Sequence, residues 1–191
     1  MENLESYKLV KKQTESFIND RHLYVANIIK ELFNPQQHKN LCEIGAGNFE
    51  LANILASSYE SIDAYEMHQE PRTKSKISNL KIYRSFDRFV NVSNYQLLIS
   101  ICPYYYAYDI YDDIDSEKET QDLIRDILDL SVDNNINSFI VLPNTFAAKE
   151  IIKEVDSKDK YKSVVYDDID LHYIKNGEMN FSKNKVLIYR K

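Results

Sequence analysis

Two glycines and two glutamates mark the part of the chain whose residue types could bind a ligand. The segment Glu43–Gly47 reads Glu-Ile-Gly-Ala-Gly, and it contains two of the three glycines in the whole sequence. Glycine tolerates left-handed backbone conformations and lets a ligand approach the backbone closely. Glu66 follows at a distance of roughly 20 residues, where an acidic side chain accepts hydrogen bonds from the hydroxyls of a ribose. We therefore predict a site for a nucleoside-containing ligand.

The predicted elements place this segment between a strand and a helix. Residues at helical spacing run from Leu4 to Phe33, and Asn34-Pro35 ends that region because a residue before proline disfavours the helical conformation. Beyond it, apolar strands alternate with helices, which indicates βαβ units and a mostly parallel sheet with helices on both faces. The predicted strands are Asn40–Ile44, Ser61–Tyr65, Leu80–Tyr83, Tyr95–Ile101 and Ser138–Leu142, and the predicted helices are Phe49–Ser58, Glu117–Asn134 and Thr145–Val155.

The last part of the chain has a different pattern. Tyr161–Tyr166, Leu171–Ile174 and Lys185–Arg190 favour strands without long helices between them, and Asn176-Gly177 is a hairpin-type turn. The sheet should therefore finish with an antiparallel pair. Because no repeat, linker or low-complexity tract interrupts the chain, we predict a single domain over 1–191, with an N-terminal helical cap (1–35) and an α/β core (39–191).

The residue at the third position of the glycine pattern distinguishes two cofactors. A dinucleotide-binding fold needs glycine there, in G-x-G-x-x-G, for close packing of the helix. This sequence has Glu50 instead, which places negative charge near the helix N-terminus where a pyrophosphate would sit. S-adenosylmethionine (SAM) carries no phosphate, so the pattern favours SAM over NAD.

These features resemble the class I SAM-dependent methyltransferases over about Asn40 to Lys191. The acidic-x-G-x-G motif matches Glu43–Gly47, and the acid that ends the second strand matches Glu66. The resemblance implies a Rossmann-like three-layer sandwich with a mostly parallel seven-stranded sheet, an antiparallel C-terminal hairpin and preceding N-terminal helices. It also implies that Glu43 orients the loop or the methionine ammonium group. The complete set of implied cofactor-binding residues is Glu43, Gly45, Ala46, Gly47, Glu66, Met67 (against adenine), Phe86 and Asp87 (near the adenine amine), and Ser100.

The segment after the fourth strand departs from the family pattern. Members that methylate exocyclic or side-chain nitrogens have Asn/Asp-Pro-Pro-Tyr/Phe there, whereas Ile101 and Cys102 replace the polar residue and the first proline in this chain. The side chain that would hold an amine is therefore absent. Tyr104 and Tyr105 begin a loop rich in Tyr and Asp, and we predict that they contact the acceptor as catalytic residues. The same loop also fits a surface loop whose tyrosines pack on the helical cap.

Charge and composition exclude several classes of partner and location. The net charge of −6 comes without any concentrated basic run, so nucleic acid is not favoured as a partner. Neither a signal peptide nor an apolar run of membrane-spanning length is evident. Cys42 and Cys102 lie in apolar segments without a partner motif, which indicates reduced thiols and a cytoplasmic location. Asp112-Asp113-x-Asp115 lacks a second set of ligands, so we predict no metal.

The sequence thus predicts a cytoplasmic SAM-dependent methyltransferase that acts on a small molecule. Two alternatives stay open at this point. One is methylation of RNA or protein, which Pro103-Tyr104 favours and the acidity opposes. The other is a non-catalytic domain of the same fold that binds SAM or a partner protein. The sequence also leaves open whether the chain forms a homodimer.

Overall fold

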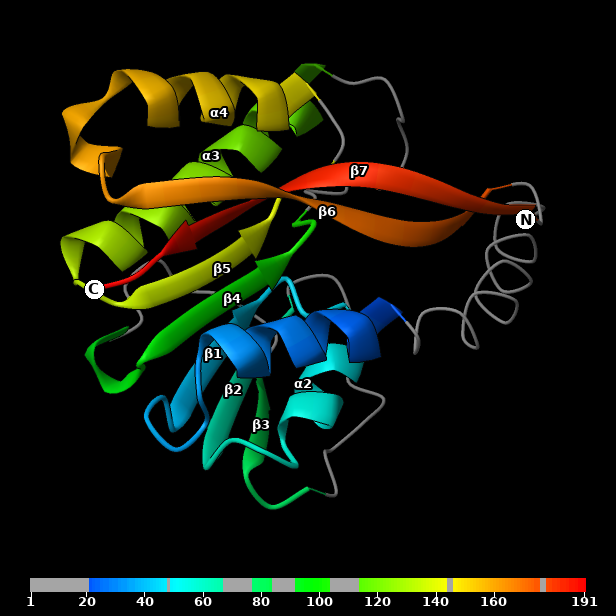
Figure 1. The fold of residues 1–191 in the computed structure, drawn as a ribbon, viewed down its shortest axis with the longest axis vertical. Coiled ribbons are helices and arrows are strands. Elements are labelled where there is room, and N and C mark those ends of the chain that lie inside the picture. Colours follow the sequence, from blue (N-terminus) through cyan, green and yellow to red (C-terminus); the bar gives the residue numbers. More distant parts are fainter. Residues whose placement is uncertain are drawn as a thin grey trace.

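A seven-stranded sheet forms the centre of the protein in a computed structural model, which describes residues 21–47, 49–66, 77–83, 92–103, 114–143, 146–175 and 178–191. Its order is β3-β2-β1-β4-β5-β7-β6 (Figure 1), with β7 antiparallel to both of its neighbours and the other pairs parallel. This arrangement confirms the predicted fold class. The strands are β1 (Asn40–Ile44), β2 (Ser61–Tyr65), β3 (Leu80–Tyr83), β4 (Leu97–Ile101), β5 (Asn137–Val141), β6 (Val164–Lys175) and β7 (Glu178–Tyr189).

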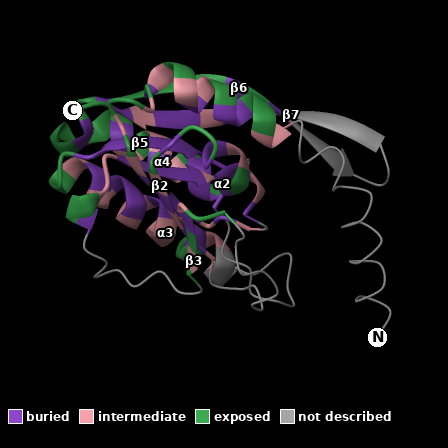
Figure 2. Ribbon diagram, turned by 90° about the horizontal axis from the view of Figure 1, so that it is seen from below, coloured by how far each residue is buried: buried purple, intermediate pink, exposed green. Residues whose placement is uncertain are grey.

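Helices cover both faces of the sheet and enclose two apolar cores. A helix over residues 21–32 and α2 (Glu50–Leu55) lie on one face, and α3 (Ile114–Asp133) and α4 (Phe146–Ser157) lie on the other. Two short 3-10 helices, η1 (Val92–Asn94) and η2 (Asp159–Tyr161), precede β4 and β6. Successive strand residues point to opposite faces, so Leu41 joins the first core and Cys42 joins the second. Figure 2 shows this buried interior between exposed helix surfaces.

The helix that follows the glycine turn is shorter than predicted. The sequence predicts helix over Phe49–Ser58, whereas α2 covers only Glu50–Leu55. Phe49 has a left-handed backbone with φ of 62° and so lies outside the helix. At the other end, the Ser57 hydroxyl donates a hydrogen bond of 2.9 Å to the carbonyl of Ile54, a local bond that competes with the continuing helix. Of the described helices, none is long and apolar enough to cross a membrane.

The C-terminal strands differ most from the prediction. Tyr161–Tyr166 and Leu171–Ile174 were predicted as separate strands, which is wrong, because β6 runs unbroken over Val164–Lys175. The acidic residues between them alternate with a buried one, since Ile169 is buried while its neighbours Asp168 and Asp170 are exposed. β7 likewise begins at Glu178 and not at Lys185, and only its last residues, from Val186 to Tyr189, pair with β5. The remainder of β7 pairs with β6 alone, so this hairpin extends past the end of the sheet (Figure 1).

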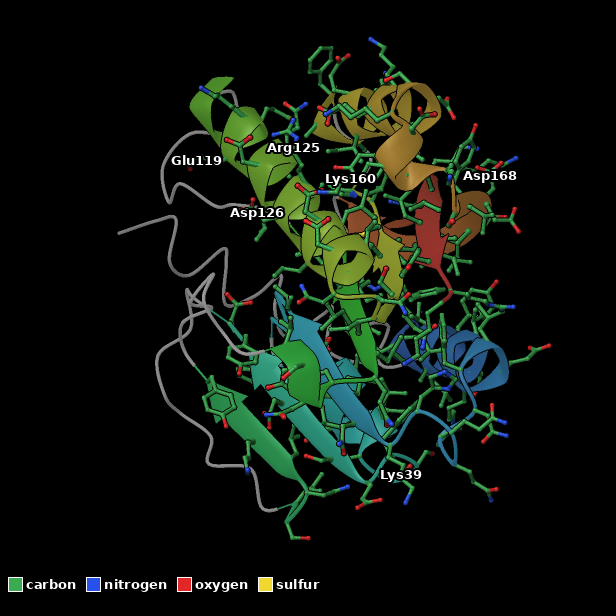
Figure 3. All side chains as sticks on the ribbon, turned by 90° about the vertical axis from the view of Figure 1, so that its left-hand side faces the viewer. Lys39, Glu119, Arg125, Asp126, Lys160 and Asp168 are labelled. Carbon is green, nitrogen blue, oxygen red and sulfur yellow. The ribbon has the colours of Figure 1, made fainter. Side chains whose placement is uncertain are left out.

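An ion-pair cluster joins α3 to α4, and Figure 3 shows its Arg125 between these two helices. The Arg125 guanidinium of α3 donates from Nε (3.1 Å) and Nη2 (2.6 Å) to the two carboxylate oxygens of Glu154 on α4. Lys158 donates to the same carboxylate at 3.0 Å. Hydrogen bonds from Arg125, then from Lys158, lower the pKa of Glu154 to about 2.

We expect Glu154→Gln to lower the free energy of unfolding by about 1–2 kcal/mol at pH 7, because a two-point contact to a partly buried carboxylate is lost. The lowered pKa means that this contribution is complete above about pH 4.5 and is lost as the pH falls toward 2. Urea unfolding at pH 7, 5 and 3 measures the difference. Glu150→Gln is the control, since the partner of Glu150, Lys153, has a side chain that is 71% exposed. The prediction would be contradicted if the free energies of unfolding of wild type and variant differed by the same amount at all three pH values.

Candidate cofactor site

The glycine turn leaves the end of β1 in left-handed conformations. Gly45 has φ of 72° and Gly47 has φ of 54°, values that cost other residues about 1–2 kcal/mol each. The backbone N–H groups of Gly45 and Ala46 both donate to the carbonyl of Tyr65, at 3.0 Å each. These bonds fix the turn against the end of β2. A side chain at Gly45 would contact Pro103, whereas one at Gly47 would meet none of the described atoms within 4 Å, its chain neighbours aside.

Glu66 lies directly beside this turn. Its Oε2 accepts a hydrogen bond of 2.8 Å from the backbone N–H of Gly47, and its own backbone N–H donates to Tyr83 of β3 at 2.9 Å. Glu66 therefore follows β2 in the position that its spacing predicts, at the carboxyl end of the sheet where open α/β folds bind ligands. The two sequence features that predict a nucleoside site are within hydrogen-bonding distance of each other.

Glu43 is the buried acid of the site. It shares with Leu41 the sheet face that α2 covers, and only 3% of its surface is exposed. Burial raises the pKa of Glu43 to about 8, with a smaller contribution from Glu66 in the same direction and an opposing one from the backbone N–H of Ala52. Its Oε2 has no hydrogen-bond partner. In the absence of a cationic ligand, this carboxyl group is mostly protonated at pH 7.

The end of β4 closes the other side of the turn. The buried Ser100 hydroxyl donates a hydrogen bond of 2.7 Å to the carbonyl of Ile44, so its hydrogen is engaged in joining β4 to β1. Cys102 follows with φ of 49°, and its N–H donates to the carbonyl of Val141 at 2.7 Å. Burial raises the pKa of the Cys102 thiol to about 11, so this group is a neutral thiol at pH 7 and a poor nucleophile.

Five predicted site residues lie outside the residues that the structure describes, and their roles stay predictions: Met67, Phe86, Asp87, Tyr104 and Tyr105. The other six are placed at one end of the sheet: Glu43, Gly45, Ala46, Gly47, Glu66 and Ser100.

Two features next to this site are not predicted from the sequence. One is the left-handed backbone at Cys102, which no sequence pattern indicates because cysteine rarely adopts it. The other is a contact between the helix over 21–32 and α2, where His22 Nδ1 lies 3.1 Å from Glu50 Oε2. Burial, and then the charge of Arg21, lower the pKa of His22 to about 4, so the imidazole in this contact is neutral at pH 7.

Solved structures share this arrangement of strands and helices. The chain is similar to magnesium protoporphyrin IX methyltransferase from Synechocystis, solved with bound SAM, at 10% identity and a TM-score of 0.58 over 94% of this chain and 83% of that one. It is also similar to precorrin 8w decarboxylase of Methanobacterium thermoautotrophicum, at 14% identity and a TM-score of 0.55 over 88% and 89% of the two chains. The chain has the fold of the class I SAM-dependent methyltransferases.

An RNA-modifying enzyme shares this methyltransferase fold as well. An rRNA methylase from Streptococcus thermophilus matches at 11% identity and a TM-score of 0.54, over 87% of this chain and 94% of that one. No family model and no curated protein matches the sequence. The similarity is therefore one of fold alone. The residues of this chain are the basis for any proposal about its activity.

Proposed function

We propose that this protein is a SAM-dependent methyltransferase that binds its cofactor at the carboxyl ends of β1 and β2 and methylates a small molecule. The observation that carries the proposal is the hydrogen bond of 2.8 Å between Glu66 and the backbone of Gly47. It brings a carboxylate suited to ribose hydroxyls against a turn where a Cβ at Gly47 would meet none of the described atoms within 4 Å, its chain neighbours aside. Glu50 near the start of α2 opposes a pyrophosphate, as the sequence predicts.

The acids of this site suit a cationic cofactor. SAM carries a sulfonium and an ammonium group, and carboxylates favour such charges in a partly buried site. Glu66 would hold the ribose hydroxyls, and Glu43 would lose its proton to pair with the ammonium group. Because the sulfonium already activates the methyl group, the protein has mainly to align the acceptor with the S–CH3 bond. A separate catalytic triad or metal is not needed for that step.

The segment after β4 supports a small-molecule acceptor over a base in RNA. Ile101 packs against the first apolar core and offers no polar group to hold an exocyclic amine. Similar solved structures include enzymes named for porphyrin-type molecules and for rRNA, so the fold is compatible with either acceptor. The net charge of −6 disfavours a phosphate backbone.

We expect Glu66→Ala to weaken binding of SAM and of S-adenosylhomocysteine (SAH) at least tenfold, because the ribose loses a charged hydrogen-bond acceptor. Isothermal titration calorimetry measures both affinities. Glu60→Ala is the matched control, since Glu60 precedes β2 at its other end and its side chain, paired with Lys39, is 66% exposed. Wild-type protein that binds neither ligand would refute the proposed function.

A transfer assay distinguishes the proposal from its alternatives. SAM with a radiolabelled methyl group is incubated with wild-type protein and separate pools of metabolites, RNA and protein. Label in the metabolite pool supports the proposal, and label only in RNA or protein replaces the acceptor class. A non-catalytic SAM-binding domain is the second candidate, favoured by Ile101 and Cys102 at the acceptor segment. Tight SAH binding without label in any pool would favour that candidate.

A further inference from the structure

Arg21 has a buried donor without an acceptor. It opens the described part of the helix over 21–32, and its Nη2 lies 3.4 Å from His22 Nε2. Its Nε is buried and has no hydrogen-bond partner. A buried donor left unsatisfied destabilises the protein, and this cost is removed when a ligand supplies an acceptor. The Nε and one Nη of a guanidinium form a planar edge that matches a carboxylate.

The contacts of its neighbour His22 and the packing of its helix place Arg21 at the same end of the sheet as the glycine turn. The adjacent His22 reaches Glu50, the first residue of α2, at 3.1 Å. The helix that carries Arg21 packs into the same apolar core as Cys102, and the charge of Arg21 lowers the pKa of the Cys102 thiol, against the larger effect of burial. The next residue, Pro103, lies beside Gly45. Arg21 is therefore near the segment after β4, which lies on the opposite side of β1 from Glu66.

Among the described residues, the side chains close to Arg21 leave its charge without an ion-pair partner. His22 is neutral at pH 7, because its pKa is lowered to about 4. The Glu50 carboxylate contacts His22, at 3.1 Å. Within the part of the chain that the structure describes, no carboxylate forms an ion pair with Arg21. A cation that forms no ion pair with the described residues, and has one buried donor free, favours an anionic ligand.

We propose that Arg21 binds a carboxylate group of the methyl acceptor, so that the substrate is a small carboxylic acid held beside Cys102 and Pro103. This inference rests on the proposed function. Arg21 is assigned to the acceptor because it lies toward β4. The proposed ligands of the cofactor lie instead at β1 and β2. The S–CH3 bond of SAM would then break as a nucleophilic atom of the acid bonds to the methyl group, and SAH would be the leaving group, with the two ligands held on either side of β1.

The test uses benzoate as the probe and benzamide as its uncharged counterpart. ¹H–¹⁵N spectra of arginine side chains are recorded on the full chain saturated with SAH, and the Arg21 Nε–H resonance is assigned by its loss in Arg21→Lys. We expect benzoate to shift this resonance and benzamide to leave it in place. Arg125, whose Nε–H is bound to Glu154 at 3.1 Å, is the internal control and should not respond. Arg21→Gln should lower the benzoate affinity at least tenfold without changing the SAH affinity.

Each contrary result has a separate meaning. An Arg21 resonance that ignores benzoate in the SAH-bound protein would overturn this proposal and leave the cofactor site intact. A tenfold loss of SAH affinity in Arg21→Gln would also overturn it, because the carboxylate bound by Arg21 would then be that of the cofactor. If the wild type binds no SAH, the proposed function fails, and the acceptor assignment fails with it.

Discussion

Replacing Glu43 by glutamine should raise the free energy of unfolding at pH 7 by about 3 kcal/mol. Glu43 is 3% exposed, and burial raises its pKa from 4.5 to about 8. At pH 7 the unfolded chain carries this group ionised, so folding must add a proton against the solution pH. Each pH unit between the two pKa values costs about 1.4 kcal/mol. Glutamine has nearly the same shape as the protonated acid and avoids this cost.

The sign of the pH dependence follows from the raised pKa. Below pH 4.5 the carboxyl group is protonated in both states and costs nothing, and the cost grows as the pH rises to about 8. Urea unfolding of wild type and Glu43→Gln at pH 5, 6, 7 and 8 should therefore give curves that diverge with rising pH. Glu60→Gln, at an exposed position, should differ from wild type by less than about 0.5 kcal/mol throughout. If the unfolding free energies of wild type and Glu43→Gln instead changed with pH in parallel, the buried carboxyl group would not be the cause of the stability difference.

The same substitution should weaken cofactor binding while it stabilises the protein. In the proposed complex the ammonium group of SAM pairs with ionised Glu43, so binding at pH 7 should release close to one proton. Calorimetry in buffers of different ionisation enthalpy measures this number. Glu43→Gln should release no proton and bind SAM at least tenfold more weakly. Such a trade of stability against binding is common where a buried charge serves a ligand.

The parts of the fold that local patterns determine were predicted well. Strands β1, β2 and β3 have the predicted bounds, because short apolar runs between turn residues leave little choice of element. The turn at Gly45 and Gly47 was also predictable, since left-handed backbone favours glycine so strongly. The distance between this turn and Glu66 followed from the βαβ connection, which returns the chain to the same edge of the sheet.

The parts that depend on tertiary contacts were not predictable. The sequence divides β6 in two, because Asp167, Asp168 and Asp170 suggest a turn until the pairing with β7 is known. Cys102 adopts a left-handed backbone that is supported by Val141 on the neighbouring strand, a contact between residues far apart in the chain. The position of Arg21 depends likewise on how its helix packs across the sheet, which periodicity alone does not determine.

Gly47→Val should reduce the affinity for SAH at least a hundredfold while the protein still folds. A Cβ at Gly47 meets none of the described atoms within 4 Å, its chain neighbours aside, so the cost to folding is that of a left-handed backbone, about 1–2 kcal/mol or more for a β-branched residue. The added methyl groups would fill the open space beside Glu66, where the proposed ribose site lies. They would also disturb the N–H that donates to Glu66 at 2.8 Å. Gly47→Ala should give an intermediate loss of about tenfold.

Asn135, which also has a left-handed backbone but lies elsewhere in the chain, provides the control for this loss of affinity. Asn135 has φ of 53° between α3 and β5, and its side chain accepts a hydrogen bond of 2.8 Å from Tyr189. Asn135→Ala should cost stability similar to that of Gly47→Val, because it combines backbone strain with a lost hydrogen bond. Thermal unfolding verifies that the two variants are matched, and calorimetry with SAH compares their affinities. Equal affinities in the two variants would mean that the space beside Gly47 is not where the cofactor binds.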